Sequence, residues 1–466
     1  MTSRSIRTKL LSVVAAFSVV AVAHIAHAQI ATFQPAGVEI DAEGVLRTRL
    51  FPDRTGDLTR QRLAAAKQAL PSEVMQASDL RMISLNRLEK EIVKRLEAGQ
   101  PLTDIMKNMA GLTKISHVFY YPETKDIVIA GPAEGFFPDN SGRMIGMETG
   151  KAVMQLDDML VALRAFAPEK QSAQTLGCSI DPTQEGLAKF QAAVNELAQK
   201  TSTNEIIIRG NENNIVDTLK TSIGKQVVTI KGVPANSHFA QVLVEADYRM
   251  KMIGIGLEPN YVDIPSWAEH VKPRSVAKNA LIRWYFEPDY QRINISEDQN
   301  AAKLIGQGIK LVGADERVAS DGSRQAAKGG DRASRNFTRE FTERYDRLAE
   351  QSPVFGQLRN LMDMAIVAAF IKEMDYYGDA GWDMPVLGDE SQLSVETLVT
   401  PTHVEPLVNG MWKGGQFAAP IGGGVTIQPS RALSVDNMLV DEDGKINETK
   451  GTVSLNDLAA DQWWWD

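Results

Sequence analysis

The chain contains a single cysteine, Cys178, which is the first residue whose type could support nucleophilic catalysis. A thiol close to a helix N-terminus has a lowered pKa and reacts as a thiolate. Asp181, Pro182 and Gln184 predict such a helix start, with Asp181 as the N-cap. Cys178 precedes this cap on a predicted strand, which turns it to the same face as the apolar Ile180. The pattern therefore favours a buried structural cysteine over a nucleophile.

A histidine and two carboxylates further along could support the general acid–base catalysis of a hydrolase. These catalytic candidates are His238 at a predicted helix start, Asp247 in the same helix and Glu258 beyond it. Ser237 precedes His238, but adjacent side chains diverge on a helix and cannot form a Ser–His pair. The alternative is structural: Ser237 or Asn236 caps the helix, and the charged side chains form a solvated face.

A polar ligand site is predicted where the same helix ends. Arg249 is a candidate ligand-binding residue there, and Gly254 and Gly256 would let a ligand approach the backbone closely. The two glycines follow a helix rather than a strand and lack a third glycine, so they do not form a dinucleotide-binding fingerprint. Asp247 and Lys251, four residues apart, are also typical of an ion pair on a solvated helix face.

The sequence carries no metal or cofactor signature. The histidines after residue 28 show none of the spacings of a zinc site. His403 and Glu405 could offer two ligands from one strand face, but a third would have to come from elsewhere. The run Asp441–Ile446 imitates the middle of a calcium loop, whereas Leu439 and Lys450 occupy its first and last ligand positions. We therefore predict no metal site and no cofactor.

An N-terminal signal peptide is predicted over residues 1–28. A basic start with Arg4, Arg7 and Lys9 precedes a long apolar stretch, and small residues lead to cleavage after Ala28. The alternative is an uncut N-terminal membrane anchor, because the apolar stretch is marginal for spanning. No later segment is long and apolar enough to span a membrane, so we expect an exported protein, periplasmic or secreted, with no transmembrane segment after signal cleavage.

Charge and composition exclude some partners. The whole chain has a formal net charge of −9, and removal of the three positive charges of residues 1–28 leaves −12. An acidic chain without a continuous Lys/Arg stripe is not expected to bind nucleic acid. A single cysteine permits no internal disulfide, so stability must come from packing.

Hydrophobic periodicity predicts a mixed α/β and α+β protein. Residues 29–168 have the pattern of an α+β domain, and residues 169–313 alternate strands and helices in an α/β layer closed by a β-meander. Residues 314–334 are rich in small and charged residues and predict a flexible linker or loop. A helical hairpin with short, Gly-rich strands follows over 335–430, and residues 431–466 form a polar tail that ends in a tryptophan cluster.

Trp463, Trp464 and Trp465 form that cluster. Three exposed indoles are costly in water, so we expect them to dock on an apolar surface. Two surfaces are open: the body of the protein itself, or an unknown envelope protein or surface as partner.

Four stretches carry a resemblance to a known family: FYYPETKDIVIAGPAEGF, LGCSIDPTQEGL, VLVEADYRMKMIGIGLEP and PVFGQLRNLMDMAIVAAFI. With them the chain resembles an uncharacterised domain-of-unknown-function family of exported, planctomycete-type bacterial proteins, from about Gly37 to Ile371. The resemblance implies export and one shared architecture along this span, and it implies no activity or site.

Two functions follow as hypotheses. The first is an exported non-catalytic binding or scaffolding protein of the cell envelope, favoured by the missing catalytic signatures and the tryptophan cluster. The second is an extracellular or periplasmic hydrolase that uses scattered carboxylate, Ser and His residues.

Overall fold

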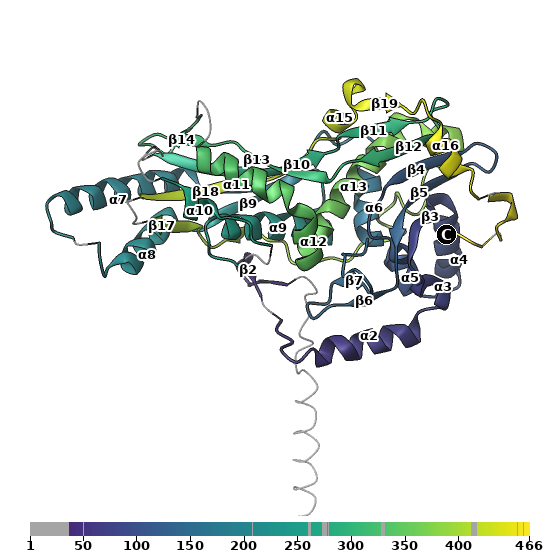
Figure 1. The fold of residues 1–466 in the computed structure, drawn as a ribbon, viewed down its shortest axis with the longest axis horizontal. Coiled ribbons are helices and arrows are strands. Elements are labelled where there is room, and N and C mark those ends of the chain that lie inside the picture. Colours follow the sequence, from purple (N-terminus) through teal and green to yellow (C-terminus); the bar gives the residue numbers. More distant parts are fainter. Residues whose placement is uncertain are drawn as a thin grey trace, which may run out of the picture. The chain divides into compact units, whose positions relative to one another are not determined.

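Two β-sheets, with helices packed on and between them, make up the described part of the chain (Figure 1). The computed structural model describes residues 37–49, 51–206, 208–259, 262–272, 277, 279–327, 331–411, 417–453, 455–459 and 461–466, all of which lie in the unit Ala36–Asp466. The predicted signal peptide lies outside the described residues. Helices and strands are interspersed along the chain, and the strands form mixed sheets. This confirms the predicted mixed α/β and α+β fold.

The first sheet contains eleven described strands. Its main order is β1 (Val38–Ile40), β2 (Val45–Thr48), β16 (His403–Val404), β9 (Gln226–Lys231), β8 (Leu176–Asp181), β18 (Phe417–Ile427), β10 (Ala280–Asp289), β14 (Glu316–Val318) and β15 (Arg324–Ala326). In addition, β13 (Gly308–Gly313) pairs with β10 and β17 (Val408–Met411) pairs with β18. Strand β18 runs antiparallel to β8 and parallel to β10, so a late segment of the chain occupies the middle of the sheet.

The second sheet contains seven described strands. Their order is β19 (Met438–Val440), β11 (Arg292–Ile295), β12 (Ala301–Ile305), β4 (His117–Tyr121), β5 (Asp126–Ala133), β3 (Ser78–Ser84) and β20 (Trp464–Trp465). A separate hairpin pairs β6 (Phe136–Pro138) with β7 (Met144–Gly146).

A long hairpin connects the two sheets and replaces the predicted β-meander. Its outer halves, β10 and β13, pair in the first sheet, whereas β11 and β12 pair in the second. The chain bends between β12 and β13 at Gly306 and Gly308, whose φ angles of 116° and 85° belong to the region that favours glycine.

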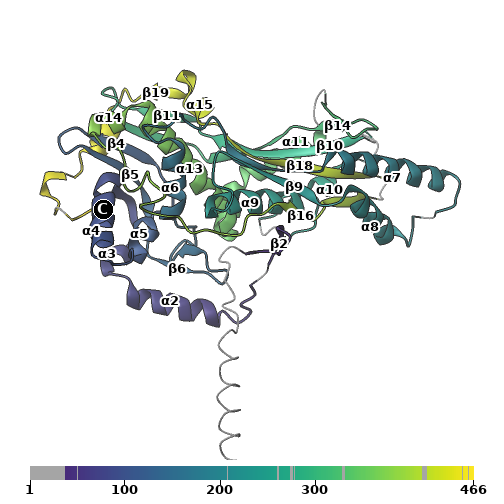
Figure 2. The ribbon, with the colours of Figure 1, turned by 180° about the vertical axis from the view of Figure 1, so that it is seen from behind.

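Three helices form the centre of the core. They are α6 (Leu156–Ala165), α9 (His238–Gly254) and α13 (Pro353–Glu373), which contact one another, and α9 also packs on β8 and β18 (Figure 2). Among the described residues, α13 has the length and apolar composition of a membrane span, but its most apolar stretch is entirely buried inside the protein. A helix that is apolar on all sides is typical of such a core position.

The other helices of the described residues pack on the sheets or on one another. They are α2 (Asp57–Ala69), α3 (Ser72–Met75), α4 (Leu85–Glu97), α5 (Asp104–Lys107), α7 (Gln184–Ser202), α8 (Glu212–Ile223), α10 (Trp267–His270), α11 (Arg332–Glu343), α12 (Tyr345–Gln351), α14 (Tyr376–Ala380), α15 (Pro429–Ala432) and α16 (Lys445–Lys450). Short 3-10 turns lie at η1 (Met109–Gly111), η3 (Val435–Asn437) and η4 (Leu455–Asp457). Ser84 caps the start of α4, because its hydroxyl accepts a hydrogen bond from the backbone N–H of Arg87.

Three sequence predictions differ from the structure. Thr183, not Asp181, caps α7, because the Asp181 carboxylate instead pairs with Arg283, 2.9 Å away. The expected linker 314–334 contains β14, β15 and the start of α11, since pairing with β10 supplies backbone hydrogen bonds that composition does not reveal. The expected polar tail 431–466 contains β19, α16 and β20, and two of these strands extend the second sheet.

Candidate functional site

Helix α9 carries most of the residues that the sequence marked as candidates, and the structure buries its charged side chains. Ser237 caps it as predicted, accepting a hydrogen bond from the N–H of Ala240. Glu245, Asp247 and Lys251 are each 0% exposed. The predicted solvated face is therefore wrong: α6, α13 and the first sheet cover the helix on several sides.

His238 forms a buried pair with a carboxylate from α6. Its Nδ1 lies 2.9 Å from Oδ2 of Asp158, and its Nε2 lies 3.5 Å from Nε2 of Gln357. Burial alone lowers the pKa of His238, but the charge and hydrogen bond of Asp158 outweigh burial and raise it. Both partners are buried, and no hydroxyl or thiol of the described residues is recorded on the His238 ring. This geometry is that of a structural pair rather than of an acyl-transfer site.

Arg249 and Glu258 belong to a second buried chain of charges. Arg143 lies 2.5 Å from one oxygen of Glu245, and Arg249 lies 3.2 Å from the other. Arg249 also binds Glu258 at 2.8 Å. Burial raises the pKa of Glu258, and the neighbouring Arg249 opposes that rise. Since two carboxylates already occupy the Arg249 guanidinium, it is not placed to bind an external anion.

Asp247 and Cys178 lie elsewhere in the core, away from His238. Asp247 pairs with Lys251, whose Nζ is 2.6 Å from Oδ2. Cys178 is buried on β8, and burial raises the pKa of its thiol well above the usual value. The structure thus supports the structural interpretation of the cysteine.

The two glycines at the end of α9 have packing roles. A Cβ atom at Gly254 would lie 2.4 Å from Cζ3 of Trp284, so the glycine lets the indole approach the helix. Gly256 has a φ of 72° and ends the helix in a turn. Neither glycine lines a cavity that the structure describes.

The tryptophan cluster docks on the protein itself. Trp464 and Trp465 form β20 and pair with Ile83 and Met82 of β3, and Ser84 donates its N–H to the carbonyl of Trp463. Trp463 and Trp465 are buried. The protein's own body therefore covers these two indoles, because β3 offers both an open sheet edge and apolar neighbours.

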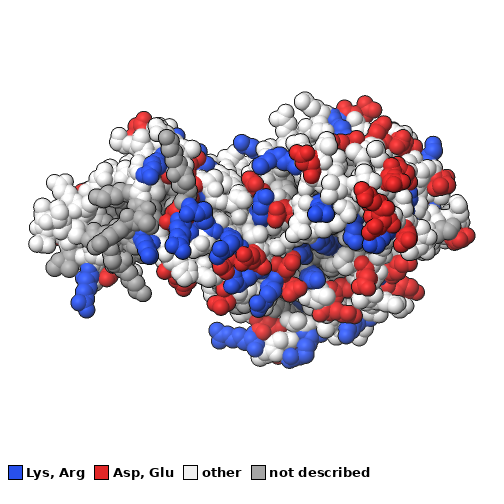
Figure 3. Space-filling view, turned by 45° about the horizontal axis from the view of Figure 1, so that its top comes forward, with Lys and Arg blue, Asp and Glu red and all other residues white. Residues whose placement is uncertain are grey.

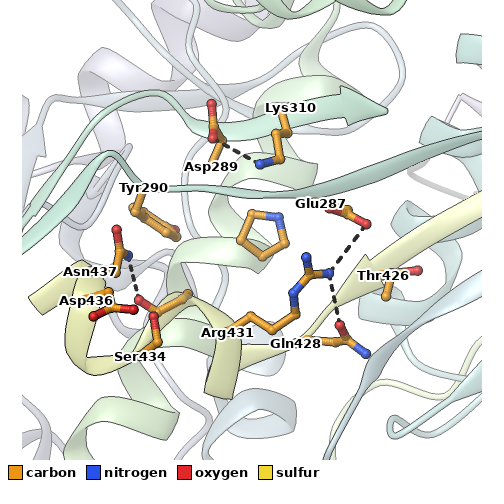
Figure 4. Close-up of a pocket in the computed structure, with 12 residues that line it drawn as sticks. Glu287, Asp289, Tyr290, Lys310, Thr426, Gln428, Arg431, Ser434, Asp436 and Asn437 are labelled. Atoms are coloured by element: carbon orange, nitrogen blue, oxygen red, sulfur yellow. Dashed lines mark hydrogen bonds and ion pairs between the residues drawn. The ribbon is translucent and has the colours of Figure 1, made fainter. Parts of the chain in front are cut away.

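A polar cavity of about 340 Å³ lies where β10, β13, β18 and α15 meet (Figure 4). It is lined by Glu287, Pro288, Asp289, Tyr290, Lys310, Thr426, Gln428, Arg431, Ala432, Ser434, Asp436 and Asn437. The cavity forms where the pairing between strands β10 and β18 ends. Pairing between β10 and β18 stops at Phe286, and Pro288 beyond it has no N–H with which to continue the ladder, so the two chains separate.

Charges of both signs converge in this cavity, which we call the polar pocket. Lys310 is 3.4 Å from Asp289, and Arg431 is 3.9 Å from Glu287, towards which its guanidinium points (Figure 4). Arg431 also donates to Oε1 of Gln428 at 3.3 Å. The Arg431 side chain is 69% exposed. Because these distances are long for ion pairs, each pair contributes little to the stability of the protein. A ligand could therefore replace the carboxylate partners of Lys310 and Arg431 at little cost in stability.

Tyr290 lines the pocket and is held in place by a hydrogen bond to helix α13. Its hydroxyl donates to Oδ1 of the buried Asp363 on α13 at 2.7 Å. Burial, with the Asp363 charge adding to it, raises the pKa of Tyr290 well above the usual value. The phenol is therefore a hydrogen-bonded support rather than a proton donor for chemistry in the pocket.

The polar pocket could not be identified from the sequence. Its residues come from three separated segments, around residues 287–290, 310 and 426–437, so no spacing along the chain brings them together. Glu287, Pro288 and Asp289 fall in the predicted β-meander, a pattern that indicates strands rather than a site, and they form the end of β10.

Comparison with protein families places a domain of unknown function, DUF1598, at residues 178–267. This segment runs from β8 to the start of α10 and includes the whole of α9. Neither the comparison with curated proteins nor that with solved structures found a match. The polar pocket lies outside the matched segment.

Proposed function

We propose that the protein is an exported, non-catalytic binding protein of the cell envelope, and that its polar pocket holds a small zwitterionic molecule. Arg431 and Lys310 would bind a carboxylate of the ligand, and Glu287 and Asp289 would bind its ammonium group. An amino acid or a short peptide with free termini has this chemistry.

One observation carries the proposal: an exposed cavity lined by two cations and three carboxylates holds both cations in long pairs of 3.4 and 3.9 Å, Lys310 with Asp289 and Arg431 with Glu287. Its volume of about 340 Å³ is at the lower end of the range of about 300–1,000 Å³ that is usual for small-molecule sites. A ligand that carries both charges would replace each long pair by a shorter, charge-assisted hydrogen bond.

We propose a non-catalytic function because the geometry of the predicted catalytic residues does not support a hydrolase. His238 and Asp247 are buried in separate pairs, and Glu258 is held by Arg249. The charge pattern of the surface agrees with a binding protein for small ligands. On the face seen in Figure 3, acidic and basic side chains of the described residues are interspersed, which does not favour a nucleic-acid partner.

Export is part of the proposal and depends on the first 28 residues. We propose that the signal peptide is cleaved after Ala28 and that the protein acts in the periplasm or outside the cell, without a transmembrane segment. The quoted resemblance extends from Gly37 to Ile371, beyond the DUF1598 segment, and we propose that the whole span belongs to one exported, planctomycete-type family. We also propose that an envelope protein or surface is a further partner. Fractionation of the cells and a pull-down with this protein as bait would test that proposal.

Calorimetric titration tests the pocket. The protein is titrated with amino acids and dipeptides, and then with the N-acetylated and C-amidated forms of whichever ligand binds. We expect both blocked forms to bind at least about tenfold more weakly, because each lacks one charge-assisted contact. We expect a similar loss for Arg431→Ala and for Lys310→Ala.

Arg339→Ala is the matched control, because Arg339 is 61% exposed, pairs with Glu340 and lies on α11 outside the pocket. It should bind like the wild type. Equal affinity for the free and blocked ligands, or an equal loss in the Arg339 and Arg431 variants, would refute the proposal.

A further inference from the structure

We propose that Asp247 and Lys251 become joined by a covalent side-chain amide bond within α9, formed by the protein itself. This isopeptide bond would be an internal modification, independent of the polar pocket. It would cross-link a chain whose single cysteine cannot form an internal disulfide.

The two reacting groups are already in contact. Asp247 and Lys251 are four residues apart on one helix, so their side chains lie one above the other. Nζ of Lys251 is 2.6 Å from Oδ2 of Asp247. Because Oδ2 is bonded to Cγ, the nitrogen also lies within about 4 Å of the carbon that it would attack, close to the separation of about 3–3.5 Å from which bonds form.

The surroundings exclude water from this contact. Both side chains are 0% exposed, and Oδ1 of Asp247 has no hydrogen-bond partner among the residues that the structure describes. Lys251 also donates to the carbonyl oxygen of Ile180 on β8 at 3.2 Å, which holds the nitrogen in place. A fully buried ion pair with an unsatisfied oxygen carries a large desolvation cost, which a neutral amide in its place would remove.

Burial, rather than neighbouring charge, favours the neutral form of Asp247. Burial raises the pKa of Asp247 to about 6, against the opposing effect of Lys251. Of the two other charges that act on this pKa, the Asp181 carboxylate raises it and Arg283 lowers it. Transfer of one proton across the 2.6 Å hydrogen bond converts the ion pair into a neutral amine and a neutral acid, which are the reactive forms.

The reaction balances without a further reagent. The amine nitrogen attacks Cγ, the C–N bond forms and one Cγ–O bond breaks. The departing oxygen leaves as water and takes one amine hydrogen and the acid hydrogen with it. The amide that remains is neutral and keeps one N–H, which can still donate to the carbonyl of Ile180.

Peptide mapping by mass spectrometry tests the bond on the exported, full-length product. Trypsin should cleave after Arg249 but not after the modified Lys251. The peptide that ends at Arg249 and the peptide that begins at Met250 should then be found joined, lighter than their sum by one water molecule. Because digestion follows denaturation, an ion pair would not survive to give this result.

The chain contains a matched internal control. Glu185 and Lys189 on α7 have the same spacing and lie 2.7 Å apart, but both side chains are exposed. They should give no cross-linked peptide in the same digest. Lys251→Arg keeps the positive charge and the tryptic site but lacks the amine nucleophile, so its digest should release both peptides separately.

A digest of the wild type in which Lys251 is cleaved normally and no joined peptide is found would overturn the proposal. An equal yield of cross-link at Glu185–Lys189 would overturn it as well, because the bond would then arise during handling and not from burial. Either result can be obtained whether or not the variant folds, since the wild type alone decides the main question.

Discussion

Replacement of Trp465 by alanine is expected to destabilise the protein by about 2–4 kcal/mol. Trp465 is 4% exposed and packs in an apolar cluster of the second sheet with Met82, Phe119 and Tyr121. Truncation of a buried tryptophan costs about 3–5 kcal/mol. Its indole Nε1 is buried and has no hydrogen-bond partner in the described part of the chain, and removal of such a group relieves about 1 kcal/mol or more. The difference is the expected loss.

Urea unfolding followed by far-ultraviolet circular dichroism measures this loss without relying on tryptophan fluorescence, which the substitution itself changes. Trp464→Ala is the control from the same strand. Its ring is partly exposed and stacks on the Arg81 guanidinium, whose carbon lies 4.7 Å from the ring centre. A cation–π contact at a partly exposed site contributes about 0.5–1 kcal/mol, so the control should lose much less than Trp465→Ala.

The result bears directly on how the C-terminus is held. Arg81 is 0% exposed and donates to both carboxylate oxygens of Asp466, at 2.8 and 3.0 Å, so the last residue also has a defined position. If Trp465→Ala unfolds at the same urea concentration as the wild type, the indole is not docked on β3. The assignment of the cluster to the protein's own body would then be refuted.

Two further predictions concern the sheets. Burial, together with the charge of Lys303, lowers the pKa of His117 to about 4 from a usual 6.5. The free energy of unfolding is therefore highest above pH 6.5, and about 3 kcal/mol of it is lost as the pH falls to 4, because the unfolded chain takes up a proton that the folded protein does not. His117→Gln should remove this acid-sensitive loss. The urea midpoints of the wild type and of His117→Gln are measured between pH 7 and pH 4. An equal fall in both proteins as the pH is lowered would contradict this prediction. Gly423→Ala should cost more than about 3 kcal/mol or prevent folding, because the residue has a φ of 129° and its Cβ would lie 1.8 Å from the carbonyl oxygen of Trp284. Soluble expression with an unchanged thermal midpoint would show that β10 and β18 are not in this contact.

Local patterns in the sequence were sufficient to predict many elements. Such local patterns include the apolar stripe of α13 with its start at Pro353, the Ser84 cap of α4 and the alternating apolar residues of β4 and β5. These features depend on contacts within a few residues of the chain, so the sequence contains the information directly. The same is true of the buried Cys178, whose alternation with Ile180 placed it on the inner face of a strand.

Only the tertiary structure decided how these elements pair and which charges they bury. Strand β18 lies between β8 and β10, and β20 pairs with β3 from the opposite end of the chain, yet neither partnership leaves a local signal. The polar pocket combines Arg431 with Glu287 for the same reason. On α9, a high density of charge is typical of a solvated face, and it became a buried network because other segments cover the helix on several sides. Burial depends on what packs against a residue, and that is a property of distant segments rather than of the residue's own neighbours in sequence.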